Sequence, residues 1–112
     1  MTIVAELKRE QKRIEEMISD LKKQKKEIDE KYSSIMEEEN RIYDEIRRCR
    51  DMYQYDKLQM KLNVIANRRK AIEEKKKGIE KKLMGYGEEL ERVKRRIEYL
   101  TPRRRIVSEG ER

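Results

Sequence analysis

The sequence predicts an all-α fold: an antiparallel two-helix coiled-coil hairpin that self-associates into a four-helix bundle. An apolar heptad repeat runs through each half of the chain, and the two repeats are out of phase. The composition agrees, since 49% of the 112 residues are charged and 35% are hydrophobic, a balance typical of coiled coils. We expect one domain, residues 1–100, followed by a basic flexible tail, residues 101–112.

The repeats place apolar residues at heptad positions a and d, which together form the seam between paired helices. With Leu7 at d, the first repeat comprises Val4, Leu7, Ile14, Ile18, Leu21, Ile28, Tyr32, Ile35, Ile42, Ile46, Cys49 and Tyr53. The second comprises Tyr55, Leu58, Leu62, Ile65, Ile72, Ile79, Leu83, Tyr86, Leu90, Val93, Ile97 and Leu100. Tyr53 and Tyr55 both occupy position a, so the phase slips by two residues. A coiled coil absorbs insertions of three or four residues but not of two, so the chain is expected to fold back here.

The first helix is expected over residues 3–50. Thr2 is a suitable N-cap, and Glu6 lies where the helix dipole favours negative charge. The turn is expected at about residues 51–55, although no glycine or proline occurs there.

The second helix is expected over residues 56–100. Asp56 and Gln59 have the spacing of a capping box. Thr101 and Pro102 end the helix, because the residue before a proline avoids the helical conformation.

Three glycines, Gly78, Gly85 and Gly87, lie inside this second helix, and each costs about 1 kcal/mol relative to alanine. A break at Gly85–Gly87 is one reading. The heptad phase continues across them, which favours an unbroken helix. The glycines also extend a row of small residues at position c, which is either chance or a strip for close approach of another helix: Val64, Ala71, Gly78 and Gly85.

Charged residues in the seam favour the hairpin over a parallel dimer of one long helix. A parallel dimer sets Glu39 against its own copy, whereas the hairpin brings Glu39 next to Arg69 as a seam ion pair. Lys25 and Lys76 have no obvious acid and are expected to extend to water. Ion pairs between g positions are expected to flank the seam: Glu45 with Lys61, Glu38 with Arg68, and Glu10 with Arg96.

Basic residues concentrate in the second half of the chain. Residues 1–52 have a net charge of −1 and residues 53–112 a net charge of +8, which together give +7. A row of cations along one helix can bind phosphates, so nucleic acid is a possible partner. The alternative is a solubilising face that pairs with the first helix. The candidate phosphate-binding residues are Lys61, Arg68, Lys75, Lys82, Arg96, Arg103, Arg104 and Arg105.

The turn gathers aromatic, methionine and arginine side chains, which are favoured at protein interfaces. The candidate partner-binding residues are Tyr43, Arg47, Arg50, Met52, Tyr53 and Tyr55. The alternative is that Tyr53 and Tyr55 close the end of the seam.

The residue content argues against an enzyme. With no histidine and one cysteine, the chain lacks the residues for a zinc site or for a Cys-His or Ser-His nucleophile. Cys49 occupies a d position, where a buried apolar thiol is expected. No glycine-rich phosphate loop occurs, and neither a cofactor nor a small-molecule substrate is expected.

No run of 18 uncharged apolar residues occurs, and the N-terminus lacks a secretory signal pattern, so no membrane contact is expected and the cytoplasm is the expected compartment. The arm length resembles that of prefoldin subunits, but the strand pattern those proteins carry between their helices is missing from residues 53–65. The sequence therefore predicts a non-enzymatic scaffold, adaptor or chaperone-like protein that binds a protein partner or a second copy, as a homodimer. Nucleic-acid binding is the alternative.

Overall fold

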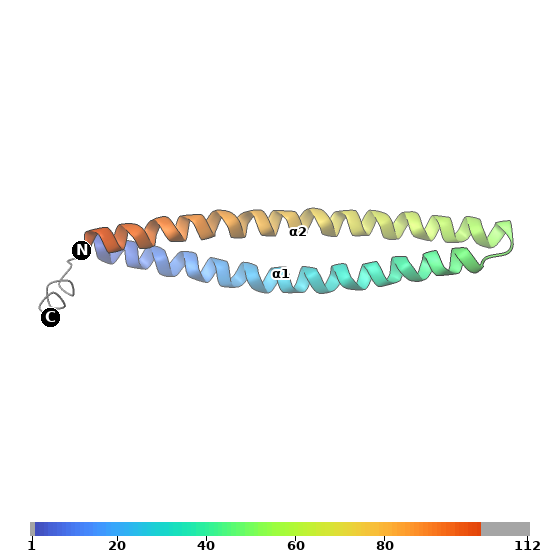
Figure 1. The fold of residues 1–112 in the computed structure, drawn as a ribbon, viewed down its shortest axis with the longest axis horizontal. Helices are drawn as coiled ribbons and strands as arrows, with labels where there is room; N and C mark the ends of the chain where they lie inside the picture. Colours follow the sequence, from blue (N-terminus) through green and yellow to red (C-terminus); the bar gives the residue numbers. More distant parts are fainter. Residues whose placement is uncertain (1, 102–112) are drawn as a thin grey trace, which may run out of the picture. The chain divides into compact units, whose positions relative to one another are not determined.

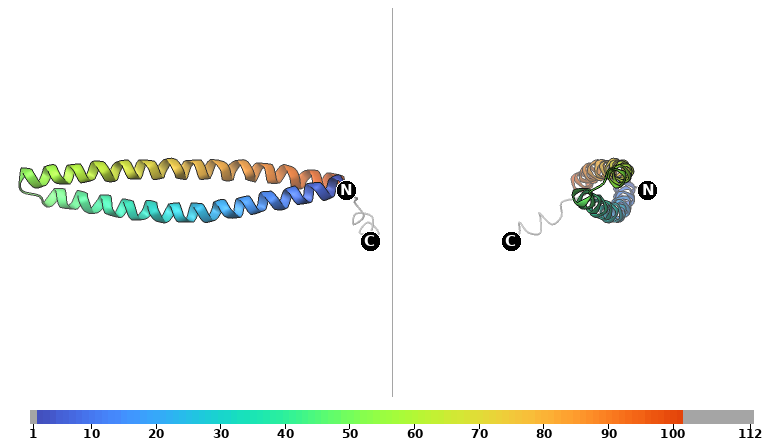
Figure 2. Two further views of the ribbon diagram at one scale, coloured as in Figure 1. Left: turned by 180° about the vertical axis from the view of Figure 1, so that it is seen from behind. Right: turned by 90° about the vertical axis from the view of Figure 1, so that its right-hand side faces the viewer.

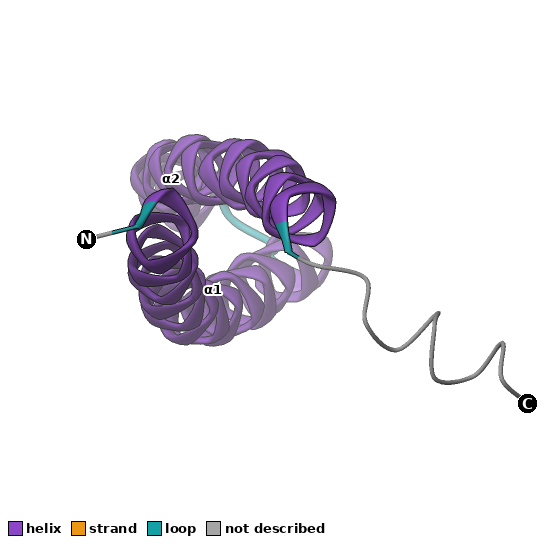
Figure 3. Ribbon diagram, turned by 90° about the vertical axis from the view of Figure 1, so that its left-hand side faces the viewer, coloured by secondary structure: helices purple, strands orange, loops and turns teal. Residues whose placement is uncertain are grey.

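The computed structural model describes residues 2–101, which form two long helices (Figure 1). Helix α1 spans Ile3–Arg48 and helix α2 spans Met52–Leu100. Short loops flank them, and the described residues contain no strand (Figure 3). The all-α prediction is confirmed. Neither helix offers an apolar stretch that would cross a bilayer within these residues.

The turn between the helices is shorter than predicted, and it comprises residues 49–51. Asp51 caps α2: its Oδ1 accepts the backbone N–H of Gln54 at 2.9 Å, and its carbonyl accepts that of Tyr55 at 3.1 Å. An aspartate at this position satisfies an amide that the first helical turn leaves without a partner. Helix α1 therefore ends at Arg48 and α2 begins at Met52, one turn earlier than expected.

The predicted capping box at Asp56 and Gln59 is wrong, because both residues already lie inside α2. The side-chain amide of Gln59 donates instead to the hydroxyl of Tyr55, at 3.1 Å. The acidic N-cap at Asp51, five residues before Asp56, makes a second cap unnecessary.

The outer helix ends agree with the sequence. Oγ1 of Thr2 accepts the backbone N–H of Ala5 at 3.0 Å, which confirms the predicted N-cap of α1. Helix α2 ends at Leu100 as predicted. The backbone N–H and the hydroxyl of Thr101 both donate to the carbonyl of Ile97, at 2.9 and 2.6 Å.

Helix α2 continues through all three glycines. None has a positive φ, and a Cβ built on Gly78, Gly85 or Gly87 would meet nothing within 4 Å. The prediction of an unbroken helix is confirmed. No neighbour among residues 2–101 requires glycine at these positions.

The contacts divide the described chain into two compact units. Residues 21–82 form one unit, in which α1 and α2 lie side by side, antiparallel, and meet at the turn (Figures 1 and 2). Its core is apolar, with Ile46, Cys49, Leu62 and Ile72 packed against Ile35, Ile42, Leu58 and Ile65.

The other unit comprises the described residues at the two chain ends, 2–20 and 83–101. Here the beginning of α1 lies beside the end of α2 in both side views (Figures 1 and 2). Ile14 has no exposed surface and Val93 is buried against the same seam.

Heptad position d provides the core. Every buried apolar side chain among residues 2–101 is at d in its own repeat: Ile14, Leu21, Ile28, Ile35, Ile42, Leu58, Ile65 and Val93. Most a positions are half-buried, and Glu39 is the buried charged residue in this part of the chain. The repeat predicts the core correctly except near the helix ends, where Tyr53, Tyr55 and Leu100 are exposed.

Because Asp51 caps α2, the Asp51→Ala variant should lower the free energy of unfolding by about 1 kcal/mol. Urea denaturation followed by circular dichroism measures the change. Asp56→Ala is the matched control and should change the free energy by less than about 0.5 kcal/mol. A larger loss for Asp56→Ala than for Asp51→Ala would contradict this description of the turn.

Candidate functional site

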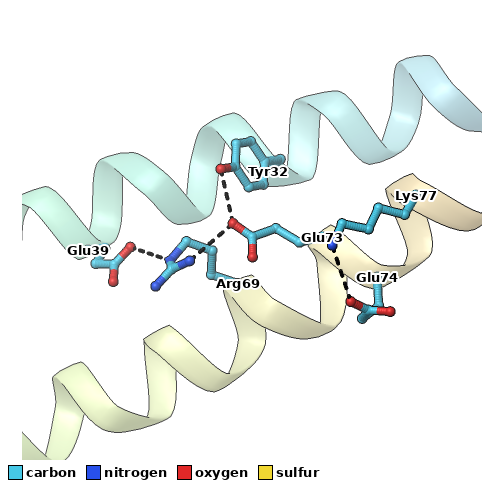
Figure 4. Close-up of polar contacts among 6 residues, drawn as sticks. All are labelled: Tyr32, Glu39, Arg69, Glu73, Glu74 and Lys77. Carbon is cyan, nitrogen blue, oxygen red and sulfur yellow. Dashed lines mark hydrogen bonds and ion pairs between the residues drawn. The ribbon is translucent and has the colours of Figure 1, made fainter. Parts of the chain in front are cut away.

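A polar network crosses the seam in residues 21–82. Nε of Arg69 lies 2.8 Å from Oε1 of Glu39, which is 5% exposed. A second guanidinium nitrogen lies 3.0 Å from Oε2 of Glu73, and the hydroxyl of Tyr32 donates to the same oxygen at 3.2 Å (Figure 4). The structure thus brings together the two residues of the predicted seam ion pair, Glu39 and Arg69, and adds two further partners.

The network continues through two lysines. Nζ of Lys76 lies 4.9 Å from the ring centre of Tyr32 and 3.2 Å from Oδ1 of Asp29. Nζ of Lys25 lies 3.0 Å from Oδ2 of Asp29 and 3.8 Å from Glu80. The expectation that Lys25 and Lys76 extend to water is therefore wrong, because Asp29, one turn after Lys25, reaches both lysines.

These contacts form one unbroken chain, here called the polar ladder: Glu39, Arg69, Glu73, Tyr32, Lys76, Asp29, Lys25 and Glu80. All eight residues occupy position a or the adjacent position e. As the partner on α1 moves from Glu39 to Lys25, the partner on α2 moves from Arg69 to Glu80. The ladder therefore follows the antiparallel register of the helices.

Contacts within the ladder shift the pKa of several of its members toward the charged form. The pKa of Asp29 is lowered by hydrogen bonds from Lys25 and then from Lys76. The pKa of Glu73 is lowered chiefly by its hydrogen bond from Arg69, and burial opposes the shift. Hydrogen bonding to Glu39 and Glu73 raises the pKa of Arg69. These hydrogen bonds thus favour the ionised forms of Asp29, Glu73 and Arg69.

The opposite side of the seam, at position g, contains no such network among the described residues. The predicted pairs Glu45–Lys61 and Glu38–Arg68 are not formed within ion-pair distance. In the other unit, Glu10 pairs with Arg13 of its own helix at 2.5 Å and not with Arg96. This contact lowers the pKa of Glu10. The predicted flanking pairs are wrong.

Two open hollows lie along this g side of residues 21–82, which we call the open side. The turn-side hollow, of about 570 Å³, is lined by Glu38, Arg41, Ile42, Glu45, Met60, Lys61, Val64 and Ile65. The lysine hollow, of about 420 Å³, is lined by Gln24, Glu27, Ile28, Lys31, Lys75, Gly78, Ile79 and Lys82.

Within residues 2–101, the candidate phosphate-binding residues do not form one continuous row. Lys61 lines the turn-side hollow, and Lys75 and Lys82 line the lysine hollow. Arg68 is exposed in the same unit, Arg96 is exposed in the other, and Arg103, Arg104 and Arg105 lie outside the described residues.

Sequence reasoning missed Lys31, which faces Lys75 and Lys82 from α1 across the lysine hollow. Lys31 occupies position g of the first repeat, and this position could have indicated that it lies beside the g lysines of α2. None of these three lysines forms an ion pair within residues 2–101.

The turn presents its large side chains to solvent. Met52 and Tyr53 are 72% and 73% exposed, and Lys57 lies 5.2 Å from the ring centre of Tyr53. Tyr43 and Tyr55 are partly exposed at 42% and 39%. Tyr53 therefore does not close the seam, whereas Tyr55 is partly covered beside Cys49.

The polar groups at the turn have simple local contacts. Arg47 pairs with Asp44 one turn earlier, and Arg50 is exposed. Cys49 is half-buried against the core, and its thiol donates weakly to the carbonyl of Asp51 at 3.2 Å. Arg50, Met52 and Tyr55 border a shallow hollow beside this thiol. The turn thus combines a fixed backbone with exposed apolar and cationic groups.

Within residues 2–101, no three acidic or cysteine side chains gather closely enough to hold a metal ion. Comparison with known proteins gives no match, whether to protein-family models, to curated protein sequences or to solved structures.

The Glu39–Arg69 pair leads to a prediction about stability. Arg69→Leu leaves the buried Glu39 carboxylate without its cation and should lower the free energy of unfolding by about 3 kcal/mol. The double variant Glu39→Leu/Arg69→Leu should recover most of this loss, because it leaves no buried charge. Urea denaturation measures both variants. Equal destabilisation by the single and double variants would show that the pair is not coupled.

Proposed function

We propose that this chain is a non-enzymatic protein-interaction hairpin, acting as a scaffold, adaptor or chaperone-like protein. Its partner binds at the turn surface, defined as Tyr43, Arg47, Arg50, Met52, Tyr53 and Tyr55. The observation that carries the proposal is the exposure of two adjacent large side chains, Met52 and Tyr53, at 72% and 73%.

Exposed side chains of this kind are the usual anchors of protein interfaces. Tyrosine, methionine and arginine are enriched there, and a few such residues supply most of the binding free energy. Burying one large apolar side chain contributes about 1.5–3 kcal/mol. Met52 and Tyr53 do not contribute this inside the hairpin, so the free energy remains available for binding.

The turn is suited to presenting these side chains. The Asp51 cap and the first turn of α2 fix the backbone of Met52 and Tyr53. Lys57 packs over one face of the Tyr53 ring, which restricts its rotamers. A preorganised surface loses less conformational entropy when it binds.

Self-association is the second part of the proposal. Two hairpins pack together as a four-helix bundle when exposed apolar side chains on their outer faces meet. Ile3 of α1 and Met84 of α2 are 61% and 68% exposed, line neither hollow, and support a further helix–helix contact. A homodimer is the simplest such assembly.

Photo-crosslinking at Tyr53 tests the proposal. A photoreactive phenylalanine analogue at this position should give a discrete adduct in cells that express the protein. The Met52→Ala/Tyr55→Ala variant should weaken partner binding at least about tenfold, the equivalent of 1.4 kcal/mol, with helicity by circular dichroism unchanged. The mass of the adduct tells a different protein from a second copy.

Tyr99 provides the matched control, because it is 81% exposed and lies far along α2. The analogue placed there should give no adduct, and Met84→Ala/Tyr99→Ala should leave binding unchanged. Equal adduct formation at Tyr53 and Tyr99, or full binding by the turn variant, would refute a role for the turn surface.

A further inference from the structure

The two sides of the seam in residues 21–82 differ in how their charges are neutralised. On one side, each charged member of the polar ladder contacts a group of opposite sign. On the open side, five basic residues and three acidic residues line the two hollows, which gives a net charge of +2. The bases are Lys31, Arg41, Lys61, Lys75 and Lys82, and the acids are Glu27, Glu38 and Glu45.

The excess positive charge is local. Lys61 and Arg41 balance Glu38 and Glu45 around the turn-side hollow. Around the lysine hollow, three lysines face a single acid, Glu27, and none of the three forms an ion pair within the described residues. Like charges held together raise the free energy of the unbound protein, and a negatively charged ligand would relieve this.

The floor of the open side is apolar. Ile42 and Ile65 form it beneath Met60 and Val64 in the turn-side hollow. In the lysine hollow, Ile28 and Ile79 lie beside Gly78, where a Cβ would meet nothing within 4 Å. An apolar floor with charged edges matches an amphipathic helix, which buries one face and pairs its flanking charges.

These features favour one class of occupant over two others. A second copy would bring an equally positive open side, so this face does not complement itself. Nucleic acid would be attracted by the lysines, but no aromatic side chain lines either hollow to stack on its bases. Phosphates also gain nothing from an isoleucine floor.

We propose that the open side of residues 21–82 binds an amphipathic helix of a partner protein. One end of the partner helix lies over Lys31, Lys75 and Lys82, and this end carries acidic residues. Val64 and Gly78 are about 21 Å apart along α2 at 1.5 Å per residue. A helix of about 20 residues therefore covers both hollows. Its apolar face packs on the isoleucine floor, and its other end lies over Met60 and Val64. This site is separate from the turn surface and does not depend on it.

Synthetic peptides serve as probes. The first is a 28-residue amphipathic helix with leucines on one face and four glutamates flanking that face at one end; in the second, lysines replace those glutamates. Fluorescence anisotropy with the full chain should show binding of the acidic peptide only. Lys31→Glu/Lys75→Glu/Lys82→Glu should weaken this binding at least about tenfold, because three charge contacts change sign.

The control variant Lys23→Glu/Lys70→Glu/Lys81→Glu changes net charge equally at exposed positions that line neither hollow. It should bind the acidic peptide within about twofold of the original chain, because the local contacts remain.

Filling the hollow gives a second test without changing charge. Gly78→Leu should weaken peptide binding, whereas Gly78→Ala should preserve it and raise the thermal midpoint, because alanine favours helix. Both variants should keep full helicity, since space is open at this position.

Three outcomes would overturn the proposal. One is equal loss of peptide binding in the two triple-lysine variants, which indicates non-specific attraction. Another is tighter binding of a 20-nucleotide single strand or duplex than of the acidic peptide, which indicates nucleic-acid recognition. The third is a dimer, seen by light scattering, that Gly78→Leu converts to monomer, which indicates that a second copy covers this face.

Discussion

Charged side chains in a helix–helix seam impose the constraint on which the rest of this structure depends. A carboxylate at position a is costly to bury unless a cation reaches it. Glu39 is buried, and Arg69 reaches it because the chain folds back at residues 49–51. In a parallel pair of long helices Glu39 would face another Glu39. The apolar d residues supply most of the buried surface, but a register defined by leucines and isoleucines alone tolerates shifts by one heptad. The alternation of charge along the polar ladder excludes such shifts, because they would place like charges together.

The same constraint makes the two sides of the seam in residues 21–82 different. The polar ladder uses the acids and bases at positions a and e, so that side of residues 21–82 is satisfied internally. The g side keeps its lysines, Met60, Val64 and Gly78 exposed. One side therefore sets the register, while the other side and the turn keep exposed side chains that no ion pair of the described residues uses. A two-helix unit has few other ways to combine a fixed register with exposed apolar surface.

Much of the fold could be predicted from the sequence, because the heptad repeat carries it. The d positions gave the buried core from Ile14 to Val93, and Thr2 and Leu100 marked the outer helix ends. The turn was harder, since Asp51 and Asp56 are both good N-caps and only tertiary packing decides between them. Its shorter form places Met52 and Tyr53 on α2, exposed, where sequence alone left open whether tyrosines close the seam.

The side-chain contacts were predicted unevenly, for a physical reason. The approach of Glu39 to Arg69 follows from the fold-back, because both occupy the seam itself. Contacts at e and g depend on the stagger and rotation of two helices, which the repeat does not specify. One indication was present in the sequence. Each seam lysine or arginine has an acid four residues later, as in Lys25 with Asp29 and Arg69 with Glu73. Lys31 escaped notice because it lies on the helix with the lower net charge.

A distance within one molecule tests the fold-back most directly. Ser34 and Ala71 are exposed at position c on the open side of residues 21–82, and spin labels there, in a Cys49→Ala background diluted with unlabelled protein, report an intramolecular distance. Antiparallel pairing in this register predicts a separation of about 20 Å or less, given helix axes about 8–10 Å apart. A single continuous helix places the same residues about 55 Å apart. A distance near that longer value would contradict the fold-back, the polar ladder and both proposed binding surfaces together.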